Sequence, residues 1–292
     1  NESLDYNVVA DAMLEDYYGL DKWFKPEVNL KLNIKPIPGL NYQQVVGYEN
    51  RQWELHQYWP STHRSEIDNS RKGHAHLAFS KTENLTSEGY FSYVKDFKGG
   101  HNLNATAGYS YFEVNGENFG MDNYNFSVDG IKYWDIGQGS YLTDGKAGMS
   151  SGKSVTERLF SFFARANYSY QDKYMLSASI RHEGSSKFAA DNRWANFWSA
   201  TAGWRISNEE FMKDFDWLDD LKIRFGYGVT GNNDFSATYM ANMLGSDTNW
   251  MMPNGTWAYS YGKSQNVNPN LGWEEKKEWN LGVDYSFFEG RL

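Results

Sequence analysis

The sequence contains no cysteine in its 292 residues. This absence excludes a disulfide framework, thiolate zinc sites and cysteine nucleophiles, and it leaves the compartment open. No apolar run approaches the ~18 residues of a membrane helix, so any membrane crossing would have to use β-strands. The formal net charge is −9 without a basic stripe, which argues against nucleic-acid binding. Because the opening "NESLDYNVVA" has no initiator methionine, basic region or apolar region, we expect a removed signal peptide or an internal piece of a longer chain.

Aromatic residues, by contrast, are abundant. They make up 17% of the chain, with 12 Trp and 21 Tyr, while the hydrophobic fraction of 40% is a little low for a packed core. Trp and Tyr favour places where one end of the side chain is apolar and the other is wet. The composition therefore indicates aromatic surfaces of the kind found at membrane interfaces and in sugar-binding sites.

Polar and apolar residues alternate with period two over most of the chain. Residues 157–206 carry three such segments, separated by "QD" and by "HEGSSKFAADNR", and they predict three consecutive antiparallel strands. The same pattern predicts strands over 27–36, 40–51, 85–96, 101–113, 220–230 and 273–287. We therefore expect nine strands, with "EGRL" as the start of a tenth.

The connections between these strands are short and long in turn. "PIPGL", "FKGGH" and "YQDKY" are typical of tight turns, and "SNEEFMKDFDWLDD" predicts a short helix with Ser207 at the N-cap and Glu210 at the third helical position. The long connections fall at 52–84, 113–157 and 231–272, with 183–193 as a shorter member. Short periplasmic turns opposite long extracellular loops are typical of an outer-membrane barrel.

A soluble β-sandwich would also alternate, and it stays open as the alternative fold. Three features favour the barrel: strands of 10 to 15 residues, aromatic residues at the strand ends, and small residues in the middle of the apolar face. Those small residues are Ala164, Ala166, Ala178, Ala200 and Ala202. Lipid tolerates them, whereas a sandwich core would require more side-chain volume.

Three long stretches then match a known family. Residues 162–212, "WLDDLKIRFGYGVTGN" and "NPNLGWEEKKEWNLGVDYSFFEGRL" closely resemble the barrel of SusC/RagA-type TonB-dependent outer-membrane transporters of Bacteroidota. The resemblance implies an all-β, antiparallel transmembrane barrel of about 22 strands with a plug in its lumen. Residues 1–292 would be an internal section of that barrel, without the plug or the TonB-contact segment.

The stretch "HEGSSKFAADNRW" raises the question of a nucleophile with its base. Neighbouring residues on a strand point to opposite faces, and a triad needs a base oriented in a fixed site. We interpret the stretch as a hairpin tip. The family resemblance supports this, because its Arg-x-acid-Gly-Ser-Ser signature before an aromatic is matched by residues 181–188, with Glu183 where Asp is more frequent.

Two further sets of residues are candidates for sites. Charged residues on the polar strand faces are expected to face the lumen, either lining a solute path or pairing with each other and with the plug: Arg165, Arg181, Arg205, Arg224, Glu278 and Asp284. Tryptophans of the long connections are candidate substrate-binding residues, or they pack the loops together: Trp53, Trp59, Trp134, Trp250 and Trp257. His74 and His76 share one strand face near His56 and His63, and we interpret them as part of a solvated loop rather than a metal site.

The sequence thus predicts a section of an outer-membrane nutrient importer, with an oligosaccharide as substrate in preference to a peptide. The resemblance implies a SusD-like lipoprotein lid and TonB as partners, besides membrane lipid. We expect no catalytic residues, metal, cofactor or nucleic acid. The alternative function is a secreted β-sandwich carbohydrate-binding module, and an outer-membrane enzyme is the weakest reading because no coherent nucleophile and base can be assembled.

Overall fold

The computed structural model describes residues 8–215, 217–236, 244–263 and 266–287. Its strands are β1 (Asp16–Phe24), β2 (Glu27–Asn33), β3 (Leu40–Trp59), β4 (His74–Phe97), β5 (His101–Tyr124), β6 (Gly148–Lys153), β7 (Glu157–Tyr170), β8 (Tyr174–Ser185), β9 (Trp194–Arg205), β10 (Leu218–Asn232), β11 (Leu244–Met251), β12 (Trp257–Lys263) and β13 (Glu274–Phe287). The helical pieces are α1 (Val8–Leu14), α2 (Arg64–Asp68) and the 3-10 segments η1 (Asp129–Gln138), η2 (Ala190–Asn192), η3 (Ile206–Asn208) and η4 (Glu210–Met212). Among the described residues, no helix is both long and apolar enough to cross a membrane.

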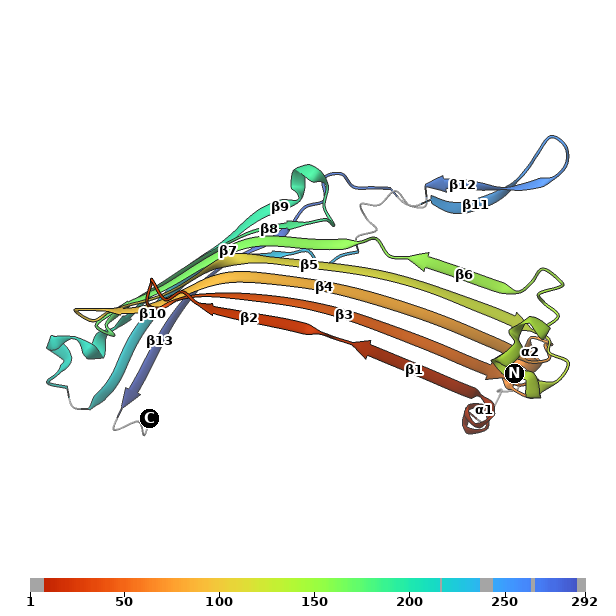
Figure 1. Cartoon of the computed structure of the whole chain (residues 1–292), viewed down its shortest axis with the longest axis horizontal. Coiled ribbons are helices and arrows are strands. Elements are labelled where there is room, and N and C mark those ends of the chain that lie inside the picture. The colour runs from red at the N-terminus through yellow and green to blue at the C-terminus, as the bar shows by residue number, and fades with distance from the viewer. Residues whose placement is uncertain (1–7, 216, 237–243, 264–265, 288–292) are drawn as a thin grey trace, which may run out of the picture. The chain divides into compact units, whose positions relative to one another are not determined.

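Eleven of the strands form one sheet, in the order β1-β3-β4-β5-β7-β8-β9-β10-β13, with β2 also paired to β3 and β6 to β5 (Figure 1). Strands β7 to β10 and β13 pair in antiparallel fashion with their neighbours. All nine predicted strands are present, so the expected antiparallel barrel section is confirmed. Its sheet is open because the chain holds only part of a barrel. The tenth predicted strand, "EGRL", lies outside the described residues.

Strands β3, β4 and β5 are longer than predicted. They span 20, 24 and 24 residues, because the alternation that begins in each predicted strand continues into the segment assigned to a long loop. The prediction of loops over 52–84 and 113–157 was therefore wrong for much of their length. A membrane strand needs only ~9–11 residues, so these strands extend well beyond the membrane. The sequence also missed β1, β6 and the β11–β12 hairpin.

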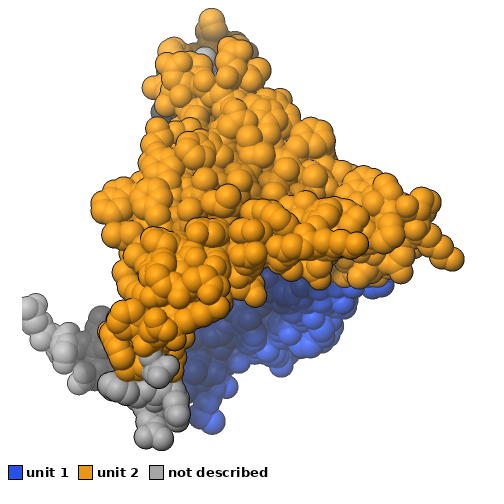
Figure 2. Space-filling model, turned by 90° about the vertical axis from the view of Figure 1, so that its left-hand side faces the viewer, with its two compact units in different colours: residues 1–26, 48–84, 114–154 blue, residues 27–47, 85–113, 155–292 orange. Residues whose placement is uncertain are grey.

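The chain divides into two compact units, coloured in Figure 2. Unit 1 comprises residues 1–26, 48–84 and 114–154, and unit 2 comprises residues 27–47, 85–113 and 155–292. Unit 1 has a conventional core, in which Tyr58, Ala75, Phe126 and Tyr133 are buried. Asp129 anchors this core by accepting hydrogen bonds from the Tyr58 hydroxyl (2.8 Å) and from the backbone N–H of Ser61 (2.9 Å).

The described residues of unit 2 form no comparable core on the apolar face of its sheet. On that face Phe162, Leu176 and Phe225 are 54%, 55% and 53% exposed. The register places Leu176 beside Ala202, and Ala202 beside Phe225, so the exposed apolar residues form a continuous surface across strands. An apolar surface of this extent requires a covering medium, and hydrocarbon supplies it in a barrel wall.

Turn chemistry explains how the strands of unit 2 are joined. Gln171 and Asp172 both have φ of +53°, as a type I′ hairpin turn requires, and Lys173 N–H donates to the Tyr170 carbonyl. The helix predicted after Ser207 is wrong. Only the short segments η3 and η4 form there, and the Ser207 hydroxyl donates to Asp220 (2.8 Å) instead of capping a helix. A competing tertiary hydrogen bond therefore removes the cap that the local sequence suggested.

Candidate functional site

The polar face of unit 2 is the surface that a barrel would turn toward its lumen. We define it as the face of β7, β8, β9, β10 and β13 that carries Asn167, Ser177, Thr201 and Asn280. These four residues and Gly226 form one row across the five strands, because Asn167 pairs with Ser177, Ser177 with Thr201, Thr201 with Gly226, and Gly226 with Asn280. The row therefore offers uncharged amide and hydroxyl groups in register.

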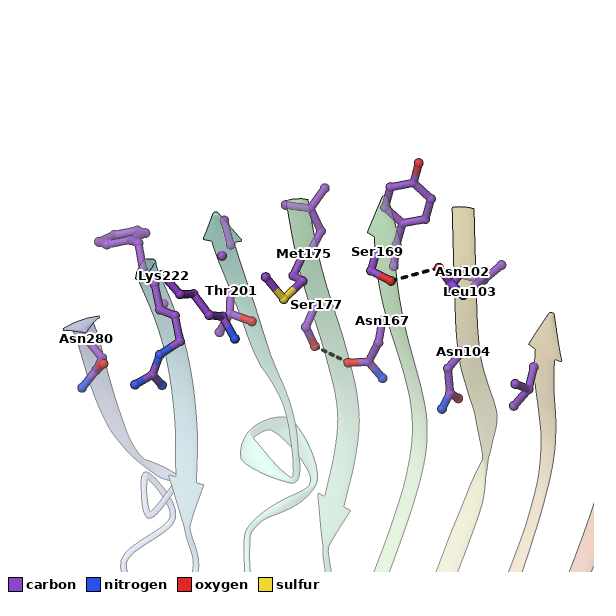
Figure 3. A pocket seen from close by; sticks show the side chains of 18 of the residues that line it. Asn102, Leu103, Asn104, Asn167, Ser169, Met175, Ser177, Thr201, Lys222 and Asn280 are labelled. Carbon is purple, nitrogen blue, oxygen red and sulfur yellow. Dashed lines mark hydrogen bonds between the residues drawn. The ribbon is translucent and has the colours of Figure 1, made fainter. Parts of the chain in front are cut away.

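A hollow of about 440 Å³ lies over this row. Figure 3 shows the side chains of Asn102, Asn167, Ser177 and Lys222, which come from strands β5, β7, β8 and β10. The Ser177 hydroxyl donates to Asn167 Oδ1 (2.7 Å), and the Ser169 hydroxyl donates to Asn102 Oδ1 (3.4 Å). The remaining amide groups of the hollow can exchange hydrogen bonds with a polar ligand or with another part of the protein.

All six charged residues predicted to face the lumen lie on the polar face. Each lies an even number of residues along its strand from a member of the row, and paired residues share a face. The pairs are Arg165 with Ser179, Arg181 with Phe197, Arg205 with Lys222, Lys222 with Asp284, Arg224 with Gly203, and Glu278 with Gly228. They are spread over several rows and do not form one cluster. That these six residues face the lumen of a closed barrel remains a prediction.

Five of the six form ion pairs within the chain. Arg224 and Asp284 are joined by two contacts of 2.7 Å, Arg181 lies 3.0 Å from Glu183, and Glu278 lies 2.9 Å from Lys276. Arg205 Nε lies 3.2 Å from Asp220 but without the alignment of a hydrogen bond, so this contact is an ion pair only. For Arg165, no ion pair or hydrogen bond of the side chain is found among the described residues.

The stretch "HEGSSKFAADNRW" joins β8 to β9, and the interpretation as a hairpin tip is confirmed. Phe188 is 1% exposed and its ring lies 5.0 Å from the ring of Phe235 and 5.1 Å from that of Trp273. Gly184 is required because a Cβ there would lie 2.7 Å from the indole of Trp194. The tip is therefore a docked structural element of unit 2.

His182 and the serines of this stretch do not form a nucleophile and base. His182 Nδ1 lies 2.8 Å from Asn196 Oδ1, and its ring stacks on Trp194. Ser185 lies three residues further along the strand, on the opposite face, where its hydroxyl accepts hydrogen bonds from Lys187 N–H and Asn233 Nδ2.

The five predicted tryptophans do not lie together in loops. Trp53 and Trp59 belong to strand β3, which corrects their assignment to a connection, and Trp59 stacks on His74 at 4.6 Å. Trp134 lies in η1 and is 75% exposed. Trp250 and Trp257 are exposed on the β11–β12 hairpin, where Trp257 pairs with Met251. Since Trp250 is the neighbour of Met251, the two rings lie on opposite faces of that hairpin and cannot form a single platform.

Unit 1 contains a polar cluster whose packing the sequence did not predict. His74 Nε2 and His76 Nδ1 each lie 2.8 Å from Asp122 Oδ1, and the His74 ring stacks between Trp59 and Tyr124. Burial lowers the pKa of His74, although the Asp122 carboxylate opposes that shift. The interpretation as a solvated loop is wrong, because this segment is the start of β4. Among the described residues, no group of three or more His, Cys, Asp or Glu residues is arranged to hold a metal ion.

An open antiparallel sheet with one continuous apolar face and one hydrogen-bonding face defines a section of an outer-membrane β-barrel. The family model described as the TonB-dependent receptor-like β-barrel matches residues 6–292, and the chain belongs to this family. It is accordingly an outer-membrane protein.

Comparison with individual similar proteins agrees with this assignment. The TonB-dependent receptor P39 of Formosa agariphila is 31% identical over 273 residues, which cover 89% of this chain and 24% of P39. The TonB-dependent receptor SusC of Bacteroides thetaiotaomicron is 37% identical over 153 residues, covering 51% of this chain and 15% of SusC. A solved structure of the RagAB peptide transporter covers 96% of this chain and 30% of the matched chain, with a TM-score of 0.80 and 22% identity, which shows the fold alone. The chain thus spans less than a third of the length of these proteins.

Proposed function

We propose that the protein containing this chain is a TonB-dependent outer-membrane importer of the SusC/RagA type. The observation that carries the proposal is the two-faced sheet of unit 2, with exposed apolar residues on one side and the amide and hydroxyl row on the other. A transporter wall needs both faces, because lipid covers one and a polar solute or a plug contacts the other.

We further propose an oligosaccharide as the substrate, delivered by a SusD-like surface lipoprotein, with TonB acting through parts of the protein outside residues 1–292. The support for a glycan is the exposed tryptophans Trp134, Trp250 and Trp257, since aromatic rings stack on the CH faces of sugars. RagAB is a peptide transporter, so a peptide is the competing substrate class.

The test is uptake by cells that express the full-length protein, with labelled oligosaccharides and labelled oligopeptides offered separately. We expect oligosaccharide uptake that is lost when TonB or the proton gradient is removed. Uptake of peptides alone would contradict the substrate class, and uptake independent of TonB would contradict the transporter type.

The tryptophan assignment has its own comparison. Trp134→Ala, Trp250→Ala and Trp257→Ala should each raise the half-saturating concentration for oligosaccharide uptake several-fold, since loss of one ring contact costs about 1 kcal/mol. Trp279→Ala is the matched control, because Trp279 is 70% exposed on the apolar face of β13 and should face lipid. Equal effects of all four changes would contradict the proposed role of Trp134, Trp250 and Trp257 in substrate binding.

A further inference from the structure

The apolar face of unit 2 is not even, because it contains a hollow of about 470 Å³. This volume lies within the range of about 300–1,000 Å³ that is typical of small-ligand sites. The lining of the hollow combines five alanines with three larger residues: Ala105, Ala107, Ala164, Ala166, Ala178, Phe91, Tyr93 and Ile180. Because an alanine side chain ends at its Cβ, the alanines leave a space between the larger residues that another molecule can fill.

The hollow faces the medium that covers the barrel wall. Ala164 and Ala166 follow Phe162 by two and four residues along β7, so they share its apolar face. The register continues this face onto β8, where Ala178 lies opposite Ala166 and Ile180 lies opposite Ala164. The Ile180 side chain is 51% exposed beside the hollow. Hydrocarbon chains are therefore the molecules that contact the hollow in a membrane.

A cation lies at one end of the hollow. Lys95 follows Tyr93 by two residues on β4 and shares its face, and Lys95 Nζ lies 5.1 Å from the centre of the Phe97 ring. The carboxylate of Asp96 is on the opposite strand face and accepts a hydrogen bond from Asn102 Nδ2 (2.7 Å). In the part of the chain that the structure describes, the Lys95 side chain has no ion pair and no hydrogen bond. The hollow thus ends, about 7 Å along the strand from Tyr93, at an exposed cation whose charge no described residue neutralises.

Aromatic residues with polar ends mark the same end of the hollow as the membrane interface. Tyr168 follows Ala166 by two residues on β7, and its hydroxyl lies 2.7 Å from His101 Nδ1. The His101 ring also stacks on Tyr170 at 4.5 Å. Tyrosine and lysine favour the interface, where their apolar parts contact hydrocarbon and their polar ends contact headgroups. Lys95 and His101 flank the tight turn between β4 and β5, and turns of this kind are periplasmic in such barrels.

A phospholipid matches both parts of this surface. Its phosphate supplies the negative charge that complements Lys95, and its flexible acyl chain can fill an irregular apolar hollow with close contacts. We propose that the hollow binds one phospholipid of the periplasmic leaflet, with an acyl chain between Phe91 and Ile180 and the phosphate paired with Lys95. The inference uses only the lipid-facing side of the sheet, so it does not depend on the proposed transport. The competing occupants are freely exchanging lipid and a second copy of the protein.

The first test is native mass spectrometry of the full-length protein, reconstituted in vesicles of phosphatidylethanolamine and phosphatidylglycerol and then released into detergent. We expect one phospholipid to remain bound to the wild type. Ala166→Phe fills the hollow and Lys95→Glu reverses the charge, so each should lower the retained fraction at least several-fold, whereas Lys95→Arg should keep the lipid. Ala202→Phe is the matched control, because Ala202 lies opposite Leu176 on the same apolar face but does not line the hollow.

The second test locates the acyl chain. Phosphatidylglycerol with a photoreactive diazirine in its acyl chain should label residues 105–107, 164–166 and 178–180 more strongly than residues 200–202 of β9. The comparison is made at equal depth, because Ala200 lies opposite Ala178. Even labelling of β5, β7, β8 and β9 would overturn the inference, since lipid would then exchange freely over the whole face.

The outcomes also separate this inference from the proposed function. Unchanged lipid retention in both Ala166→Phe and Lys95→Glu would overturn it, and so would an equal loss in Ala202→Phe. A protein dimer in place of the lipid adduct would assign the hollow to a second copy. If the phospholipid is retained but TonB-dependent uptake is absent, the lipid site stands and the transporter proposal fails.

Discussion

Glu209 illustrates how single residues hold the short connections of unit 2 in place. Its carboxylate accepts hydrogen bonds from the Tyr174 hydroxyl (2.6 Å), Lys173 Nζ (3.0 Å) and Trp204 Nε1 (3.1 Å). These donors, Tyr174 foremost, lower the pKa of Glu209 from 4.5 to about 2. The residue lies between β9 and β10, outside the strands, and ties that connection to the start of β8.

A pH dependence follows from this lowered pKa. The contribution of Glu209 to stability is complete above its unfolded pKa of 4.5 and is lost as the pH falls through about 2. Glu209→Gln should therefore lower the melting temperature in detergent at pH 7 and should flatten the decline between pH 4.5 and 2. The control is Glu210→Gln, whose exposed pair with Lys213 should contribute little. Parallel melting curves of wild type and Glu209→Gln across this range would contradict the assignment.

At the scale of elements, long strands and docked tips replace the loops that the sequence indicated. Strand β4 begins at His74, whose ring stacks between those of Trp59 and Tyr124. The strand therefore starts within unit 1, in a segment that the sequence indicated as a loop. The β8–β9 tip is held by Phe188, whose partners Phe235 and Trp273 come from segments that follow β10. The tip is therefore fixed by contacts between residues far apart in sequence.

Truncation of Phe188 tests that docking. Phe188→Ala should destabilise the tip by about 3 kcal/mol, because the ring is fully buried and leaves a cavity. Hydrogen exchange of residues 186–193 should accelerate while exchange in the middle of β8 is unchanged. Phe162→Ala is the control, since that ring is half exposed on the apolar face. Uniform acceleration throughout unit 2 would show that the tip is not a local element.

For the whole molecule, the decisive property is that no described residue forms a layer over the apolar face of the unit 2 sheet. The only other sheet formed by the described residues is the β11–β12 hairpin, which is too small to act as the second layer of a sandwich. The carbohydrate-binding sandwich is therefore not supported, and the apolar face is left to lipid.

Neighbouring positions on one strand can test the two faces. Ile180→Arg, in the middle of β8 on the apolar face, should cost about 2–4 kcal/mol and should reduce the heat-modifiable, folded barrel recovered from outer membranes. Ser179→Arg introduces the same group at the neighbouring position on the polar face, where it should be tolerated. A reversed order of folded yields would show that the faces are assigned the wrong way round.

The sequence by itself determined the nine strands and their two faces, because period-two alternation and tight-turn residues are local properties that do not depend on the partner strands. It indicated the family separately, through the resemblance of three long stretches to known barrels. It also placed all six charged residues on the polar face. Only the tertiary structure decided which cations are paired. By register alone, Asp284 could form an ion pair with either Arg224 or Lys222. It likewise decided that Ser207 bonds Asp220 instead of capping a helix, and that His74 is stacked in unit 1 rather than solvated. Each of these outcomes depends on contacts between side chains from different strands or connections. The local sequence pattern does not specify contacts between residues that are far apart in the chain.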